Sequence, residues 1–377
     1  MIPITASMLY DYVSCPHRVA MDLRGNLADR DEVSPFVQLL WERGFAHEQE
    51  VISGLQVQFL DLSKIEDNER EKSTLEAMKR GEPLIYSGRI SANGLLGIPD
   101  LLRKEDGGYI AGDIKSGSGE EGGSDDEDGK PKVHYAVQVA LYTDILEQLG
   151  LSAGHRAFIW DVRGDEVGYD FTAPYGIRKP RTLWQDYLEC LGDVQAIVNG
   201  AQTLPAYSSA CKQCVWYSAC LKGLEAANDL TLIPFLGRAL RDTMKEQIAT
   251  IEALAEINPE GFITDKGKKT VFTGLGPDRL KKFQARAKML TIKDSKPYLS
   301  VPITLPLSDR ELFFDIEVDP MRDICYLHGF IERNAGDNDT EIDSGDGKIK
   351  QRILDYNEDD CRATRVLLDG IRQLTTH

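Results

Sequence analysis

The chain has 377 residues, of which 42% are hydrophobic, and a formal net charge of −17. This length and apolar content allow a sizeable buried core and predict two or three domains. No run approaches the roughly 20 apolar residues that span a membrane, and the N-terminus lacks the basic start of a secretory signal. We therefore expect a cytoplasmic protein that has no membrane partner.

The first predicted block covers residues 1–225 and mixes helices with strands. Ser34 and Pro35 are typical of a helix N-cap and first helical position, and they open a predicted helix that runs towards Leu55. Residues 117–131 form a Gly/Ser-rich acidic insert, which predicts a disordered loop. Because six acidic residues gather there, the negative net charge does not exclude nucleic acid as a partner.

A β-hairpin is predicted in the middle of this block. Residues 95–103 and 109–115 have the pattern of strands, and the Asp106-Gly107 pair between them is typical of a two-residue type I′ turn. This turn places Asp100 directly opposite Asp113. Such opposed side chains share one face of the hairpin, with Cβ atoms about 5 Å apart.

The opposed acids predict a metal site. Two carboxylates at this separation repel each other unless a cation lies between them, and oxygen ligands suit Mg²⁺ or Mn²⁺. Lys115 follows Asp113 by two residues and therefore points to the same face. A metal here would activate water, and the lysine would stabilise developing negative charge. The alternative is a solvated hairpin whose acids only keep a sheet edge soluble.

Other polar residues carry less information by themselves. Gln138 and Tyr142 are four residues apart, so they share one face of the helix predicted after the acidic insert. His47 lies in the middle of the helix that begins at Ser34. Taken alone, each of these residues is more often a packing or surface residue than a catalytic one.

Four of the seven cysteines enclose the block, with Cys15 near its start and Cys211, Cys214 and Cys220 near its end. An odd number of cysteines, three of them within ten residues, indicates metal binding rather than disulfides in a cytoplasmic protein. Four thiolates can hold either a [4Fe–4S] cluster or a zinc ion. Either group would tie the two ends of the block together.

Taken together, these motifs resemble the RecB-like branch of the PD-(D/E)XK nuclease superfamily. This branch includes the AddB-type helicase–nucleases and the CRISPR-associated adaptation nucleases, and the resemblance covers roughly residues 1–223. It implies a restriction-endonuclease-like α/β core with flanking helices. It further implies metal ligation by His47, Asp100 and Asp113, catalysis by Lys115, and substrate binding or ordering of the site by Gln138 and Tyr142.

The resemblance also extends to cofactor, substrate and partners. The one-plus-three cysteine arrangement is similar to that of the iron–sulfur members, so it favours a [4Fe–4S] cluster over zinc. Relatives mostly process DNA ends, which implies a single-stranded or end-containing DNA substrate and exonuclease activity. Because related nucleases often work beside a helicase, it implies a helicase partner and a role in DNA repair, recombination or defence.

The second block, residues 228–300, is predicted to be mostly helical. The turn Gly274-Leu275-Gly276-Pro277 resembles a helix–hairpin–helix element, in which backbone N–H groups at a helix N-terminus hold a phosphate. Eight basic residues surround this turn and would add salt-sensitive attraction to nucleic acid. They are Lys266, Lys268, Lys269, Arg279, Lys281, Lys282, Arg286 and Lys288. The alternative is a solvated basic face.

The third block, residues 306–377, shows two β-rich runs, 311–318 and 324–331, and a helix from about Leu354. Asp315 and Glu317, with Asp360 on the helix, resemble the carboxylates of a ribonuclease H-like 3′–5′ exonuclease of the DEDD type. That fold needs about twice the length available here, and the polar stretch containing Asp337, Asp339 and Asp343 offers no scaffold for its middle carboxylate. We therefore expect a truncated, inactive domain with a vestigial second metal site.

The combined expectation is a metal-dependent nuclease that hydrolyses DNA. Two alternatives stay open. One is a catalytically decayed, iron–sulfur-containing nucleic-acid-binding protein, and the other is a nuclease directed at RNA.

Overall fold

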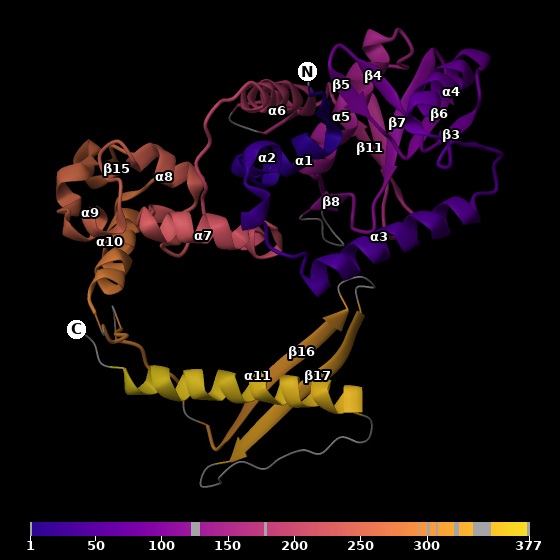
Figure 1. Cartoon of the computed structure of the whole chain (residues 1–377). Coiled ribbons are helices and arrows are strands. Elements are labelled where there is room, and N and C mark those ends of the chain that lie inside the picture. The colour runs from indigo at the N-terminus through magenta and orange to yellow at the C-terminus, as the bar shows by residue number, and fades with distance from the viewer. Residues whose placement is uncertain are drawn as a thin grey trace. The chain divides into compact units, whose positions relative to one another are not determined.

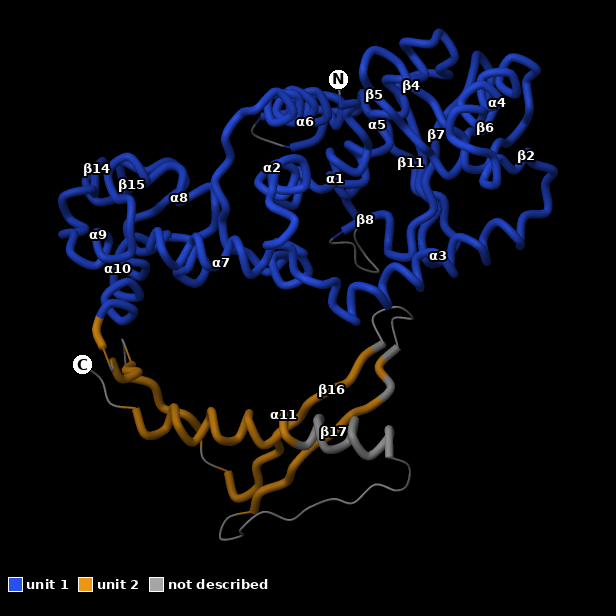
Figure 2. Tube along the Cα trace, in the orientation of Figure 1, with its two compact units in different colours: residues 1–291 blue, residues 292–377 orange. Residues whose placement is uncertain are grey.

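The computed structural model describes residues 2–121, 129–176, 179–293, 295–299, 302–306, 308–319, 324–334 and 348–374, with the side chains at 319, 324, 326 and 348–358 excepted (Figure 1). The chain divides into two compact units, Met1–Thr291 and Ile292–His377 (Figure 2). Within the described residues, no helix combines the length and apolar character needed to cross a bilayer.

The first unit is built on a mixed sheet with the strand order β11-β10-β7-β6-β3-β2. Its strands are β2 (Leu60–Asp61), β3 (Leu84–Tyr86), β6 (Leu101–Glu105), β7 (Gly108–Ile114), β10 (Arg156–Trp160) and β11 (Glu166–Asp170). Strands β7 and β10 run parallel, because helix α5 (Val133–Gln148) lies between them in the sequence and carries the chain back across the sheet.

Strands β6 and β7 form the predicted hairpin. Leu101 pairs with Gly112 and Glu105 with Gly108, which is the register predicted from the Asp-Gly turn. The first predicted strand, 95–103, is not continuous. Its first part is β5 (Leu95–Gly97), which pairs with β1 (Ile4–Thr5) and β4 (Ile90–Ala92) in a separate small sheet. The chain changes sheets at Ile98–Asp100, where Pro99 cannot donate a ladder hydrogen bond.

Helices cover both faces of the central sheet (Figure 1). On one face, α5 packs against α1 (Ala6–Ser14) and α6 (Leu183–Val198), and its buried residues form the main core. Helix α2 (Pro16–Arg24) packs against α1 and α6, and α4 (Asp67–Arg80) packs against β4. On the other face, Ile52 of α3 (Pro35–Gly54) joins a second core with Leu101, Ile110 and Phe158. As predicted, Ser34 caps α3, because its hydroxyl accepts the Val37 N–H at 3.2 Å.

The flanks of the acidic insert are paired strands. The short strands β8 (Glu120–Glu121) and β9 (Lys130–Pro131) run antiparallel, and the Tyr169 hydroxyl donates to the Gly119 carbonyl at 2.6 Å. The disorder expected for 117–131 therefore does not extend to these flanks, and residues 122–128 lie outside the described part of the chain.

Residues 228–291 complete the first unit and have a core of their own, which includes Leu254, Phe272, Leu280 and Phe283. The helices and strands here are η3 (Leu230–Leu232), α8 (Arg238–Met244), α9 (Ile251–Glu256), η4 (Pro259–Phe262), β14 (Ile263–Thr264), η5 (Asp265–Gly267), β15 (Lys269–Thr270) and α10 (Pro277–Thr291). The turn at 274–277 follows strand β15 and leads into helix α10. The prediction of a helix–hairpin–helix element is therefore wrong for the first helix, whose place a strand takes.

Small elements complete the first unit. They are η1 (Leu27–Asp29), β12 (Pro174–Tyr175), β13 (Arg181–Thr182), η2 (Ser209–Gln213) and α7 (Tyr217–Ala226).

The second unit is a two-stranded antiparallel ribbon with one helix packed on it. The strands are β16 (Arg310–Asp319) and β17 (Ile324–Asn334), and the helix α11 (Lys348–Gln373) begins earlier than predicted. Glu311 on β16 pairs with Arg333 and Arg372, which join both strands to α11. The guanidinium groups of Arg372 and Arg333 lower the pKa of Glu311 to about 2.

Candidate functional site

The open end of the β6–β7 hairpin holds the two acids close together. Asp100 directly precedes β6, and Asp113 lies in β7. The Ile114 N–H donates to Oδ2 of Asp100 at 2.7 Å, and the Asp100 N–H donates to Oδ1 of Asp113 at 3.3 Å. These bonds fix both carboxylates from the backbone of the opposite strand, so their positions depend on the hairpin register.

Lys115 lies beside the two acids and lines the same cavity as Asp100. Its Nζ donates to Oδ2 of Asp113 at 2.8 Å, and the Asp113 residue is only 1% exposed. Burial and the charge of Asp113 raise the pKa of Asp100 well above its usual range, although Lys115 opposes this shift. Burial alone would lower the pKa of Lys115, but Asp113 and Asp100 outweigh it and raise that pKa. One ammonium group thus faces one buried and one partly buried carboxylate, so a further positive charge would be favourable here.

These residues open into a cavity of about 400 Å³ between α3, α5 and the hairpin. Its lining is Ser7, Tyr10, Gly44, Glu48, Asp100, Ile114, Lys115, Ser116, Tyr135 and Gln138. Glu48 is the acid that the sequence analysis missed. Its Oε1 accepts the Tyr86 hydroxyl at 2.8 Å, and its charge adds to the raised pKa of Asp100. The spacing of Gly44 and Glu48, four residues apart on one helix face, is a signal that could have identified it.

His47 is the neighbour of Glu48 on α3, but it does not line this cavity. Its Nε2 is buried and has no hydrogen-bond partner among the described residues. An unpaired imidazole nitrogen is costly to bury unless something else contacts it, so this atom is available as a ligand. Glu48 and His47 are both candidates for the position beside Asp100 and Asp113.

Gln138 and Tyr142 both lie on helix α5, close to the two acids of the hairpin. Gln138 lines the cavity, and its Oε1 is buried without a partner among the described residues. Tyr142 is only 3% exposed, and its hydroxyl lies 3.5 Å from both Gln138 Nε2 and the Ile98 carbonyl. Tyr142 therefore packs beneath the chain that leads to Asp100, whereas Gln138 faces the cavity.

The structure brings the four cysteines to one second cavity, beside Arg18 and Trp216. Cys15 lies between α1 and α2, and the other three lie in η2, after it and in α7. Arg238 of α8 donates to the Cys15 Sγ at 3.2 Å, so the block 228–291 also contacts this site. We call Cys15, Cys211, Cys214 and Cys220 the four-cysteine site.

The four thiols meet at one cavity, although in the described residues no three of their sulfur atoms lie within 4.8 Å of one another. Four thiolates can hold either a zinc ion or a [4Fe–4S] cluster. Burial raises the pKa of Cys220 to about 11, so this thiol stays protonated near neutral pH unless a cation binds it.

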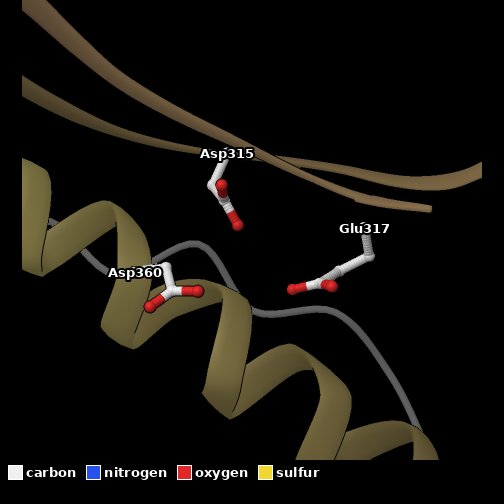
Figure 3. Close-up of side chains that lie close together, drawn as sticks. All are labelled: Asp315, Glu317 and Asp360. Atoms are coloured by element: carbon white, nitrogen blue, oxygen red, sulfur yellow. The ribbon is translucent and has the colours of Figure 1, made fainter. Parts of the chain in front are cut away.

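A third group of acids lies in the second unit. Asp315 and Glu317 on β16 and Asp360 on α11 point towards one another (Figure 3), with carboxylate oxygens within 4.8 Å. Oε1 of Glu317 is buried and has no partner among the described residues. The structure thus gathers the three residues that the sequence analysis grouped. The candidates for a fourth carboxylate, Asp337, Asp339 and Asp343, lie outside the described residues.

Comparison with known proteins bears on the first unit. The family model of the PD-(D/E)XK nuclease superfamily matches residues 7–221, more than half of the chain. No curated protein matches the chain. The matched segment contains Pro99-Asp100 and Asp113-Ile114-Lys115, of which Asp100, Ile114 and Lys115 line the first cavity. Members of this superfamily are typically nucleases that use divalent metals such as Mg²⁺. The chain belongs to the PD-(D/E)XK nuclease superfamily.

Proposed function

We propose that the protein is a Mg²⁺- or Mn²⁺-dependent nuclease that hydrolyses DNA, and that it acts on single-stranded ends. The observation that carries this proposal is the geometry of Asp100, Asp113 and Lys115: Asp100 and Lys115 line an open cavity, and the buried Asp113 carboxylate accepts a hydrogen bond from the Lys115 ammonium group. Asp100 and Asp113, with Glu48 or His47, would hold the divalent cation, which would supply an activated water and neutralise phosphate charge.

In this proposal the protein's own groups orient the reaction. The Lys115 ammonium, held by Asp113, would face the scissile phosphate and stabilise the charge that develops on it. The Gln138 side chain, with its unpaired Oε1, would contact the substrate or the nucleophilic water. Tyr142 would fix the chain leading to Asp100 from below.

The experiment is digestion of end-labelled linear and circular single-stranded DNA with Mn²⁺. It compares protein purified without oxygen with its Lys115→Ala variant. Loss of the linear substrate with the unmodified protein alone supports an exonuclease that uses this site, whereas digestion of the circle as well indicates an endonuclease. If neither protein cuts and both bind DNA, the decayed binding protein is the correct interpretation. Competition with RNA of the same sequence tests the RNA-directed alternative.

We also propose that the four-cysteine site holds a [4Fe–4S] cluster with a structural role. The convergence of four thiols from two distant parts of the chain on one cavity supports this proposal. Iron and acid-labile sulfide are measured after purification without oxygen, in the unmodified protein and in Cys220→Ser. Zinc in place of iron, or equal iron in both proteins, would contradict it.

For the second unit we propose a vestigial site and no second cleavage activity. Asp315, Glu317 and Asp360 lie on a unit whose described residues form two strands and one helix, and these do not include the larger sheet of a ribonuclease H-like domain. The Asp315→Asn/Glu317→Gln variant should therefore cut DNA as fast as the unmodified protein. A loss of activity in this variant alone would show that the triad takes part in cleavage.

The resemblance to RecB-like and AddB-type proteins further supports a cytoplasmic protein that works with a helicase partner in DNA repair, recombination or defence. In this proposal, residues 228–291 contribute to DNA binding through their exposed lysines. Co-purification with a helicase encoded nearby would test the partnership.

A further inference from the structure

Two large aromatic side chains stand out on the surface of α3. Trp41 is 58% exposed and Phe45 is 65% exposed, although each offers a flat apolar ring that would normally be buried. They are four residues apart, so they lie one above the other on the same side of the helix. Together they form an exposed aromatic pair about one helical turn long.

This pair borders the metal-site cavity. Gly44 and Glu48 of the same helix line the cavity, and they follow Trp41 and Phe45 by three residues each. Residues three apart on a helix are surface neighbours, so the aromatic pair continues the helix surface from the cavity rim outwards. A strand that leaves the cavity along this side of α3 would therefore pass Trp41 and Phe45.

Aromatic rings also form part of the cavity wall itself. Tyr10 of α1 and Tyr135 of α5 both line it, with ring centroids 6.2 Å apart and planes inclined by 27°. The Lys115 Nζ lies 5.6 Å from the centre of the Tyr135 ring. This lysine is thus flanked by flat surfaces of the kind on which bases stack.

Because the cavity is lined by few positive charges, its affinity for nucleic acid would depend on these aromatic rings. Among the described residues that line it, Lys115 is the one cation, whereas Asp100 and Glu48 are acidic. Attraction to phosphates is the usual source of affinity for nucleic acid, and this cavity offers little of it. Stacking of bases is independent of phosphate charge, but it requires bases whose faces are not covered by neighbours in a duplex.

We propose that Trp41 and Phe45 form a stacking platform that holds unpaired bases next to the metal site and thereby selects single-stranded nucleic acid. This inference rests on the proposed nuclease function for its biological use, but the binding that it describes can be measured without cleavage. Affinity should depend strongly on the presence of bases and only weakly on salt concentration.

The test is binding of two labelled 15-mers to the full-length protein without added divalent cation. One is oligo-dT, and the other carries abasic sites, so both have the same phosphates. The unmodified protein should bind oligo-dT more tightly. Trp41→Ala and Phe45→Ala should each weaken oligo-dT binding about five- to a hundredfold, with no change for the abasic strand. Oligo-dT should also quench tryptophan fluorescence in the unmodified protein, because Trp41 is exposed.

Leu39→Ala is the matched control. Leu39 is 45% exposed on the same helix, but it lies on the side away from Gly44 and Glu48. This variant should keep the preference for oligo-dT, which separates loss of the platform from general damage to α3. If another protein covers Trp41 and Phe45 instead, both aromatic variants will bind oligo-dT normally, and the proposal is overturned. Equal binding of the two strands by the unmodified protein overturns it as well.

Failure of the nuclease proposal gives a different result. If the unmodified protein prefers oligo-dT but never cuts DNA, the platform stands and the cleavage function fails. If the protein cuts single strands and the aromatic variants bind and cut like the unmodified protein, the function stands and the platform fails. Lys115→Ala should retain the preference for oligo-dT in either case.

Discussion

The contact between Lys115 and Asp113 gives a prediction that separates the electrostatics of the site from its chemistry. In Lys115→Met the alkyl chain remains, but the ammonium group is lost, and Asp113 stays buried beside Asp100 without a cation. Removing one partner of a buried ion pair typically costs about 3–5 kcal/mol in unfolding free energy. Because the Lys115 side chain is 19% exposed, we expect a value near the lower limit, about 3 kcal/mol.

Asp113→Asn should cost less, about 1 kcal/mol, because Lys115 still faces Asp100 and the amide can accept a hydrogen bond. The double variant should cost about 2 kcal/mol, since an uncharged thioether chain would then face a neutral amide, and this is less than the sum of the two single changes. The difference, about 2 kcal/mol, is the coupling energy between the two side chains.

The assay is urea unfolding followed by tryptophan fluorescence. All four tryptophans lie within residues 1–291, so the signal reports on the unit that contains the site. Mn²⁺ should restore more stability to Lys115→Met than it adds to the unmodified protein, because the cation replaces the missing charge. If the loss of unfolding free energy in the double variant equals the sum of the two single losses within about 0.5 kcal/mol, the two side chains are not coupled. That result would refute the electrostatic argument.

Three further predictions concern neighbouring positions. Burial raises the pKa of Asp100, so this carboxyl group stabilises the metal-free fold at low pH and destabilises it as the pH rises through that pKa. Asp100→Asn should therefore raise the Tm of the metal-free protein at pH 7 and abolish the rise in Tm that Mn²⁺ causes. A normal rise in Tm with Mn²⁺ would contradict this. Glu48→Gln should increase the Mn²⁺ concentration for half-maximal cleavage about tenfold or more, and an unchanged titration would exclude Glu48 from the metal site. Gly112→Ala should cost about 1–3 kcal/mol, because a Cβ there would lie 2.3 Å from the Phe158 ring; Gly168→Ala, which meets no atom within 4 Å, should leave Tm nearly unchanged.

Local chemistry made the hairpin predictable. The Asp106-Gly107 turn determines which residues face each other across β6 and β7, and therefore the neighbourhood of Asp100 and Asp113 follows from the turn type alone. The prediction did not recognise that residues 95–97 join another sheet. These residues pair with Ile90–Ala92 through the Asn93-Gly94 turn, which is a local hairpin signal that the prediction overlooked. They also pair with Ile4 and Thr5, some ninety residues earlier, and no local signal encodes that second pairing.

The sequence also did not reveal which face of helix α3 is buried. Exposed apolar residues such as Phe36, Leu39, Trp41 and Phe45 blur the amphipathic pattern from which a buried face is normally inferred. His47 was therefore chosen by resemblance, whereas the structure turns Glu48 into the cavity. The position of α10 after strand β15 was missed for a related reason, since a two-residue strand leaves no periodic signal.

The four-cysteine site has a consequence for the order of synthesis. Its first thiol is made about 200 residues before its last, which at 5–20 residues per second corresponds to about 10–40 s on the ribosome. Every strand of the central sheet precedes Cys211 in the chain. The central sheet can therefore assemble before Cys211, Cys214 and Cys220 are made, and binding of the proposed cluster would be a late maturation step. Arg238, made later still, would then contact Cys15 at a site that is already complete.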